Sequence, residues 1–176
     1  FAQAIINPHG LEKSDKNPEY NDVYTFYKSM DANHATIRMA TAGPTDTDDS
    51  LQVVYYSANG KFDISNWKAD DKVIIFINNG IHPGEPDGIV ASMQLLWDIT
   101  ADKISIPDNV VLAIIPVFNI SGAKSLRTGT RANQNGPALT GFRGNAQNLD
   151  LNRDFIKMDA KETRSLVRLF RALDPD

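Results

Sequence analysis

His82 and Glu85 stand three residues apart in a turn that contains Gly84 and whose backbone is restricted by Pro83 and Pro86. An imidazole nitrogen and a carboxylate oxygen are two of the ligand types that zinc accepts in one coordination shell. Because the turn is tight, both side chains can converge on one metal ion. The alternative is that Glu85 caps a helix, where its negative charge is stabilised, beside an incidental histidine. On these residues alone, both interpretations stay open.

A second group of polar side chains lies in residues 143–155, a segment rich in Asn, Asp and Arg. Asn152 and Arg153 place an amide beside a guanidinium, and arginine is suited to bidentate recognition of a carboxylate. Arg143 adds a further cation to the same segment. The alternative interpretation is a solvated loop that carries arginines on its surface. By itself, this segment therefore does not establish a binding site.

The elements that must position the first turn are a strand and a helix. Residues 72–78 are mostly Val, Ile and Phe, and residues 86–99 have the apolar spacing of a helix. Residues 110–118 are apolar almost throughout, as expected for a strand that is buried on both faces. In α/β sheets, ligands bind outside the carboxyl ends of the strands. We therefore expect His82 and Glu85 at such an end.

The rest of the chain alternates between strand and helix patterns. The expected elements are a helix over 18–30, strands over 35–40 and 51–57, and a helix over 159–173. Asn17 and Asp159 are the expected caps of the two helices, and residues 59–60 (Asn-Gly) are compatible with a hairpin. The aspartates of residues 46–49 suggest a solvated turn, and residues 119–153 suggest a long loop that is either functional or disordered. This alternation predicts an α/β fold with a largely parallel sheet.

Composition limits the class of protein. The chain is 41% apolar and 23% charged with a net charge of -4, which is typical of a globular protein in water. Its 176 residues suit one domain over 1–176 with an irregular lead-in over 1–16. A nucleic-acid footprint and a membrane span are not expected, and the absence of cysteine excludes disulfides and thiolate sites.

The start of the chain bears on localisation. Ala2 and Ala4 resemble the end of a signal peptide, which predicts a secreted or periplasmic protein. The alternative is that they mark an arbitrary chain boundary.

Together, the two motifs resemble the zinc metallocarboxypeptidase family (M14) typified by carboxypeptidase A. Residues 82–85 (His-Pro-Gly-Glu) follow a buried strand, and residues 150–155 (Asp-Leu-Asn-Arg-Asp-Phe) come later in the family's order. The resemblance covers residues 17–173 and is strongest at 74–98 and 141–156. It implies a three-layer α/β/α fold around a mixed sheet, of the phosphorylase/hydrolase-like zinc peptidase type. It also implies an enzyme that removes C-terminal residues from peptides by metal-activated water.

The resemblance implies that His82 and Glu85 are the first two zinc ligands. The family's third ligand, a histidine, and its catalytic glutamate lie well C-terminal to the Asn-Arg pair, beyond Asp176. His9 and His34 precede the first motif, so the family order does not favour them as ligands. The chain alone, the N-terminal portion of a catalytic domain, is therefore expected to bind zinc weakly and to be inactive.

On the substrate side, Asn152 and Arg153 match the pair that holds the C-terminal carboxylate of the peptide. Arg143 matches the arginine that polarises the scissile carbonyl and stabilises the oxyanion. Arg131 is a rival for that role and a further substrate-binding candidate, although the spacing to the Asn-Arg pair favours Arg143. Residues 119–122 (Asn-Ile-Ser-Gly) depart from the family's Asn-Pro-Asp-Gly turn, a departure expected to touch no catalytic group.

Two rival functions stay open at this stage. One is an amidohydrolase of the same fold that acts on acyl-amino acids or peptidoglycan peptides. The other is a non-catalytic domain that binds carboxylates without a working metal site. For the carboxypeptidase, the expected partner is a peptide or peptide-like substrate with a free C-terminal carboxylate. An edge strand without a neighbour is also expected to make the chain self-associate.

Overall fold

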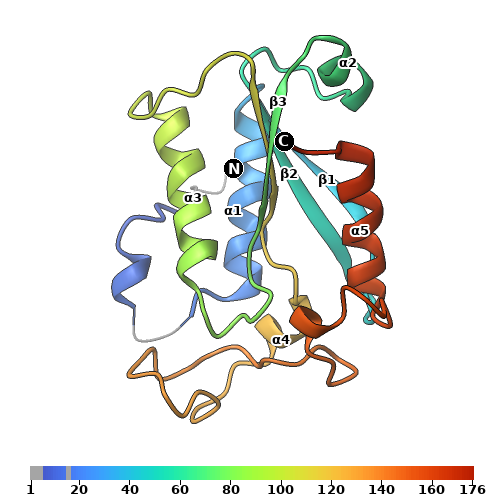
Figure 1. Ribbon diagram of the computed structural model, residues 1–176. Helices are drawn as coiled ribbons and strands as arrows, with labels where there is room; N and C mark the ends of the chain where they lie inside the picture. Colours follow the sequence, from blue (N-terminus) through green and yellow to red (C-terminus); the bar gives the residue numbers. More distant parts are fainter. Residues whose placement is uncertain (1–5, 15–16) are drawn as a thin grey trace.

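The computed structural model describes residues 6–14 and 17–176. Its centre is a four-stranded mixed sheet with the strand order β1-β2-β4-β3 (Figure 1). The strands are β1 (Ile37–Pro44), β2 (Ser50–Ser57), β3 (Val73–Asn78) and β4 (Val110–Ile115). The described helices are α1 (Tyr20–Asn33), α2 (Ile64–Ala69), α3 (Asp87–Thr100), α4 (Ile120–Lys124) and α5 (Lys161–Leu173), with 3-10 turns η1 (Leu11–Lys13) and η2 (Leu151–Arg153).

The sheet is mixed, but the described strands are not largely parallel, and that part of the prediction is wrong. β1 pairs with β2 and β2 with β4 in antiparallel fashion, whereas β3 and β4 are parallel. The physical reason is the length of the connections. The short turn at 45–49 joins β1 directly to β2, and such a turn can only join antiparallel neighbours, whereas α3 provides the crossover that parallel strands need.

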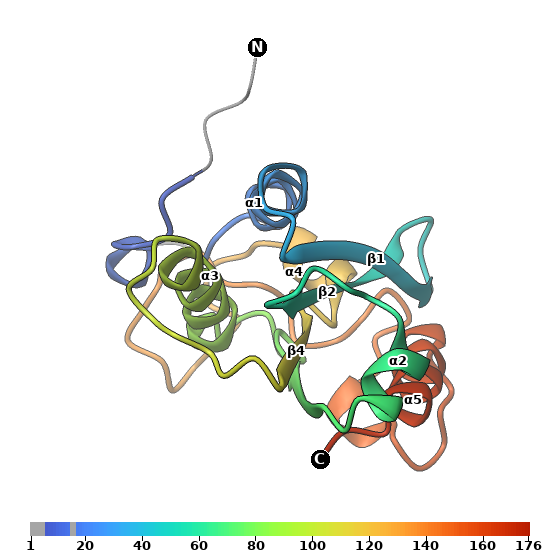
Figure 2. The same cartoon turned by 90° about the horizontal axis from the view of Figure 1, so that it is seen from above.

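Helices cover both faces of the sheet, so the described part of the chain has three layers. α1 and α3 lie on one face and α5 lies on the other (Figures 1 and 2). β4 contributes alternate side chains to the two cores, as its apolar sequence predicts: Leu112 and Ile114 to the core under α1 and α3, Val111 and Ile115 to the core under α5. Trp67 of α2 packs in the second core, edge-on against Tyr55.

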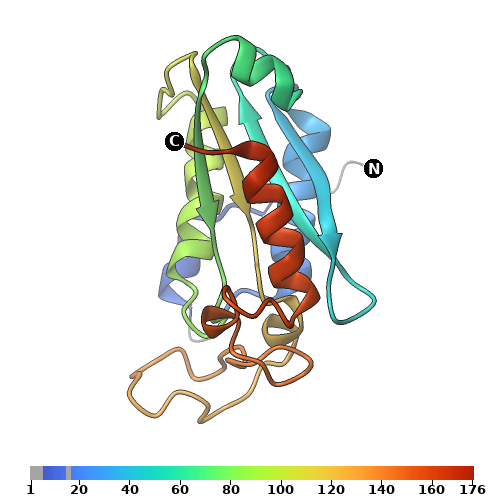
Figure 3. The ribbon, with the colours of Figure 1, turned by 45° about the vertical axis from the view of Figure 1, so that its right-hand side comes forward.

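The carboxyl ends of β1, β3 and β4 point to the same end of the sheet, where residues 119–153 fold (Figure 3). This segment is irregular, as predicted, apart from α4 and η2. Neither α4 nor α2 was expected, because helices of five or six residues are too short to show a helical period. Residues 59–60, which are compatible with a hairpin, form a turn that leads into α2 instead.

The predicted helix caps are replaced by other contacts. α1 begins at Tyr20 with Glu19 at the N-cap position, and the backbone N–H of Asn17 instead donates to the carbonyl of Leu139 at 3.0 Å. α5 is preceded by Ala160, and the backbone N–H of Asp159 donates to the Asp154 carboxylate at 2.9 Å. Residues that looked like caps therefore bind other parts of the chain.

β3 is an edge strand of the sheet formed by the described residues. Ile75 is 43% exposed there, and the backbone N–H of Asp176 donates to the Ile74 carbonyl at 3.1 Å. Self-association through this edge stays a prediction.

The signal-peptide-like residues Ala2 and Ala4 lie outside the described residues. Within the described part of the chain, every helix is too short or too polar to cross a bilayer.

Candidate metal and carboxylate site

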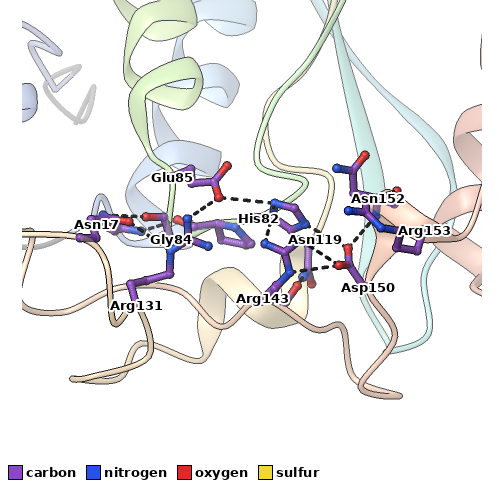
Figure 4. A network of polar contacts seen from close by, with 12 residues as sticks. Asn17, His82, Gly84, Glu85, Asn119, Arg131, Arg143, Asp150, Asn152 and Arg153 are labelled. Carbon is purple, nitrogen blue, oxygen red and sulfur yellow. Dashed lines mark hydrogen bonds and ion pairs between the residues drawn. The ribbon is translucent and has the colours of Figure 1, made fainter.

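The turn that follows β3 is fixed to the strand, to α3 and to itself. Gly80 adopts a φ of 65°, a left-handed conformation that favours glycine. The buried side chain of Asn79 donates to Ser92 of α3 at 2.9 Å. The backbone N–H of Glu85 donates to the carbonyl of His82 at 2.9 Å. As a result, the side chains of His82 and Glu85 lie side by side (Figure 4).

Both ring nitrogens of His82 have polar neighbours, although only 7% of this residue is exposed. Its Nδ1 lies 3.5 Å from Oε1 of Glu85 and 3.3 Å from Nη1 of Arg143. Its Nε2 lies 3.0 Å from Oδ1 of Asp150. Because an ionised carboxylate only accepts hydrogen bonds, Nε2 of His82 is the donor to Asp150.

The residues at this position fit two ligands of a zinc ion. Two ligands of tetrahedral zinc, each about 2.1 Å from the metal, are about 3.4 Å apart, and the His82 and Glu85 donors are separated by 3.5 Å. Metal-bound histidines commonly donate their other N–H to a carboxylate, which here is Asp150. Over residues 6–14 and 17–176, no group of three or more His, Cys, Asp or Glu side chains could hold a metal ion. The described residues thus fit part of a zinc site.

Asp150 connects the histidine to the second predicted motif. Its Oδ1 accepts a hydrogen bond from the backbone N–H of Asn152 at 3.0 Å, and its Oδ2 accepts from Nε and Nη2 of Arg143 at 3.0 and 2.9 Å. Burial raises the pKa of Asp150, but the bonds from His82, Arg143 and Asn152 outweigh it and hold that pKa below its usual value. Asn152 and Arg153 follow on η2, with both side chains exposed.

Arg131 lies on the other side of Glu85. Its Nη2 contacts Oε1 of Glu85, and its Nε donates to Oε1 of Gln134 at 3.1 Å. Burial raises the pKa of Glu85, but the guanidinium of Arg131 and the ring of His82 outweigh it, so that this pKa is lowered. Glycine at position 84 gives the arginine room, because a Cβ there would lie 3.3 Å from Cδ of Arg131.

The structure brings all six predicted site residues to one end of the sheet, whereas the other two histidines lie elsewhere. A polar hollow of about 360 Å³ lies between Arg131 and Arg143. His9 contacts Asp98 in the second half of α3 at 2.8 Å, and His34 follows the last residue of α1. The roles of the six residues stay predictions, and both arginines remain candidates for the oxyanion role.

Three further residues that contact the site were not predicted as site residues from the sequence. Asp150 forms the contacts described above. The side chain of Asn17 donates to the carbonyl of Pro83. Asn119 caps α4, and its Nδ2 donates to the carbonyl of Arg143 at 2.9 Å, so the residue of this turn that keeps the family's Asn contacts the backbone of a catalytic candidate. For Asp150 and Asn119 the sequence offered a signal. The side chain of an Asp or Asn can accept a hydrogen bond from the backbone N–H two or three residues further along the chain.

Asn145 connects the site segment to the β1–β2 turn and to α5. Its Oδ1 accepts a hydrogen bond from the backbone N–H of Leu149, and its Nδ2 donates to Asp46 at 3.1 Å and to Glu162 at 3.5 Å. Asp46 also accepts from the backbone N–H of Lys161 at 3.3 Å. The prediction of a solvated turn is therefore wrong for Asp46. This residue joins the β1–β2 turn to two distant segments, the one with Asn145 and the start of α5.

Glu162 gives this network a pH dependence. Its side chain is fully buried, and burial, reinforced by the charge of Asp46, raises its pKa. The native state therefore keeps the proton after the unfolded chain has lost it, so the stability that Glu162 contributes is present below its usual pKa and is lost as pH rises through the folded value. We expect Glu162→Gln to unfold like the wild type near pH 4 but to be more stable by about 1–2 kcal/mol near pH 8.

Urea unfolding of both proteins at the two pH values measures this effect. If the Glu162→Gln and wild-type proteins differ equally at both pH values, the raised pKa is not the cause.

Comparison with known proteins adds to this geometry. The model of a family described as zinc carboxypeptidase matches residues 23–166. A comparison with curated proteins gives no match. A metallo-carboxypeptidase from Burkholderia cenocepacia is similar in structure, with a TM-score of 0.69, 16% identity, and coverage of 91% of this chain and 39% of that chain.

Two animal proteins show the same similarity. For carboxypeptidase A from Helicoverpa armigera the TM-score is 0.65 at 16% identity, covering 89% of this chain and 42% of that chain. For bovine thrombin-activatable fibrinolysis inhibitor, solved with tick carboxypeptidase inhibitor, the TM-score is 0.66 at 15% identity, covering 89% of this chain and 56% of that chain.

At these identities the structural likeness shows the fold. The chain spans about two-fifths to just over half of the length of these solved structures. The family model, in contrast, matches most of the chain, including the turn with His82 and Glu85 and the segment with Asn152 and Arg153. The chain therefore belongs to the zinc carboxypeptidase family.

Proposed function

We propose that this chain carries the first part of a zinc carboxypeptidase site, and that the whole protein removes C-terminal residues from peptides. The observation that supports this most is the position of Asp150. It bonds to the ring of His82 through the same oxygen that accepts the backbone N–H of Asn152. A metal-ligand candidate and a carboxylate-binding candidate therefore lie on either side of one carboxylate.

His82 and Glu85 would hold the zinc ion, with further protein ligands and a general base supplied from outside the described residues. When bound, zinc supplies a Lewis acid that polarises a carbonyl and lowers the pKa of water. The contribution of Asp150 is to accept the Nε2–H of His82, which fixes the tautomer and keeps the Nδ1 lone pair available.

The substrate would be bound by the exposed pair on η2. The guanidinium of Arg153 can hold both oxygens of a C-terminal carboxylate, and the Asn152 amide can donate a further hydrogen bond. Arg143, oriented by Asp150, can donate to the negative oxygen that develops on the scissile carbonyl. A site that requires a free carboxylate limits the reaction to chain ends.

The test is a comparison of two ligands. In the presence of zinc, an N-acetylated dipeptide with a free carboxylate should bind more tightly than its C-terminal amide, in a calorimetric titration. Arg153→Ala should weaken binding of the acid about tenfold to a hundredfold, the range of hydrogen bonds to a charged group, and leave the amide unaffected.

Arg171→Ala is the matched control, because Arg171 is an exposed arginine in the last turn of α5. It should bind both ligands like the wild type. Equal affinity of the unmodified chain for the acid and the amide would refute the proposed carboxylate site.

A further inference from the structure

Each of the two candidate metal donors faces an arginine. Nη1 of Arg143 lies 3.3 Å from Nδ1 of His82, and Nη2 of Arg131 contacts Oε1 of Glu85 (Figure 4). Oε1 is also the oxygen that lies 3.5 Å from the histidine nitrogen. The guanidinium of Arg131 therefore contacts the Glu85 oxygen that faces Nδ1 of His82. A metal ion shared by the two side chains needs this same oxygen.

Several contacts hold Arg131 in this position. Its Nε donates to Gln134, whose own amide donates to the carbonyls of Gly84 at 3.1 Å and of Gly136 at 2.7 Å. Its methylene groups pack over Gly84, and only 22% of the side chain is exposed. These contacts hold the side chain of Arg131 against the turn that carries Glu85. They distinguish it from an exposed arginine that forms an ion pair without other contacts.

The two arginines differ in how their charges are balanced. Two nitrogens of Arg143 bond to Asp150, which is not a candidate ligand, so this arginine keeps its counter-ion when a metal binds. The ion pair of Arg131 is with Glu85 itself. A divalent cation bound to Glu85 would take away this counter-ion and place like charges beside each other, which is unfavourable.

We propose that Arg131 regulates metal loading: it occupies the Glu85 oxygen that a metal ion requires, and the ion must displace it. This inference rests on the proposed function, because it takes His82 and Glu85 as metal ligands. The polar hollow of about 360 Å³ that Arg131 lines with Thr130, Asn133 and Arg143 gives the displaced guanidinium a place to go. The site therefore exchanges one cation for another.

Zinc titration of the chain against a chromophoric chelator measures this exchange without any activity assay. Arg131→Met keeps the length of the side chain and removes its charge, and should bind zinc about tenfold or more tightly than the wild type. Arg131→Lys keeps the charge and should bind zinc like the wild type. Arg127→Met is the matched control, since Arg127 lies on the same segment but stacks on Phe142.

The result that overturns the proposal has the opposite sign. If Arg131 instead orients Glu85 for the metal, Arg131→Met binds zinc more weakly than Arg127→Met. Equal affinities of the two variants also overturn it. His82→Ala separates this failure from that of the proposed function. If His82→Ala loses affinity while Arg131→Met gains none, only the exchange is wrong, whereas an unchanged His82→Ala protein refutes the metal site.

Discussion

Replacing His82 by alanine is expected to lower the zinc affinity of the chain by about a hundredfold or more. The substitution removes one of the two described metal donors and leaves Glu85 as a single carboxylate, paired with Arg131. Because zinc sites need several ligands in a fixed geometry, one carboxylate holds the ion only weakly. Competition of the chain with a chromophoric chelator for zinc gives the dissociation constants.

Two companion variants make this result specific. His34→Ala alters a histidine at the end of α1 and should leave zinc affinity unchanged. Asp150→Asn keeps both donors but replaces the charged acceptor of the His82 Nε2–H by a neutral amide, and should weaken zinc binding about tenfold to a hundredfold. Equal zinc affinities for the His82→Ala and His34→Ala proteins would argue against His82 as a ligand.

Phe118→Ala should cost about 3–5 kcal/mol of folding free energy, the usual range for a buried phenylalanine. Phe118 is fully buried between the end of β4 and the start of α4. Its ring stacks on Phe155, with centroids 6.1 Å apart, and so joins the sheet to the segment that follows Arg153. The loss should therefore also increase the mobility of the site segment. Urea unfolding measures the first effect and amide hydrogen exchange the second.

Phe170→Ala is the control for this prediction. Phe170 packs edge-on against Phe76 at 5.6 Å but is 46% exposed, so its removal should cost about 1 kcal/mol. Similar losses for the two variants would show that Phe118 does not form the connection inferred here.

Most elements of the fold could be predicted because burial leaves a pattern in the sequence. Val73–Asn78 and Val110–Ile115 are apolar runs between polar turns, and α5 has an apolar stripe. Strand direction could not be predicted in the same way, because it depends on which strands pair. The alternation of strands and helices suggested a largely parallel sheet, while the short turn at 45–49 in fact joins two antiparallel strands.

The site was predictable to the extent that its residues fall in local motifs. His82 and Glu85 share one turn, and Asn152 and Arg153 are adjacent, so each pair carries its own spacing. Asn17 could not be identified in this way, since its partners at positions 83 and 139 are remote in the chain. Contacts between distant loops leave no periodicity, and the sequence showed Asn17 only as a plausible helix cap.

The long reach of Asp46 has a consequence for how the domain folds. Its partners Asn145 and Lys161 are 99 and 115 residues further along the chain. Contacts at such separations carry the largest loop-closure entropy and form after local structure. The segment with Arg143 and Asp150 is therefore expected to be held only when the β1–β2 turn and α5 have come together at Asp46. We expect the candidate site to be ordered late in folding for the same reason.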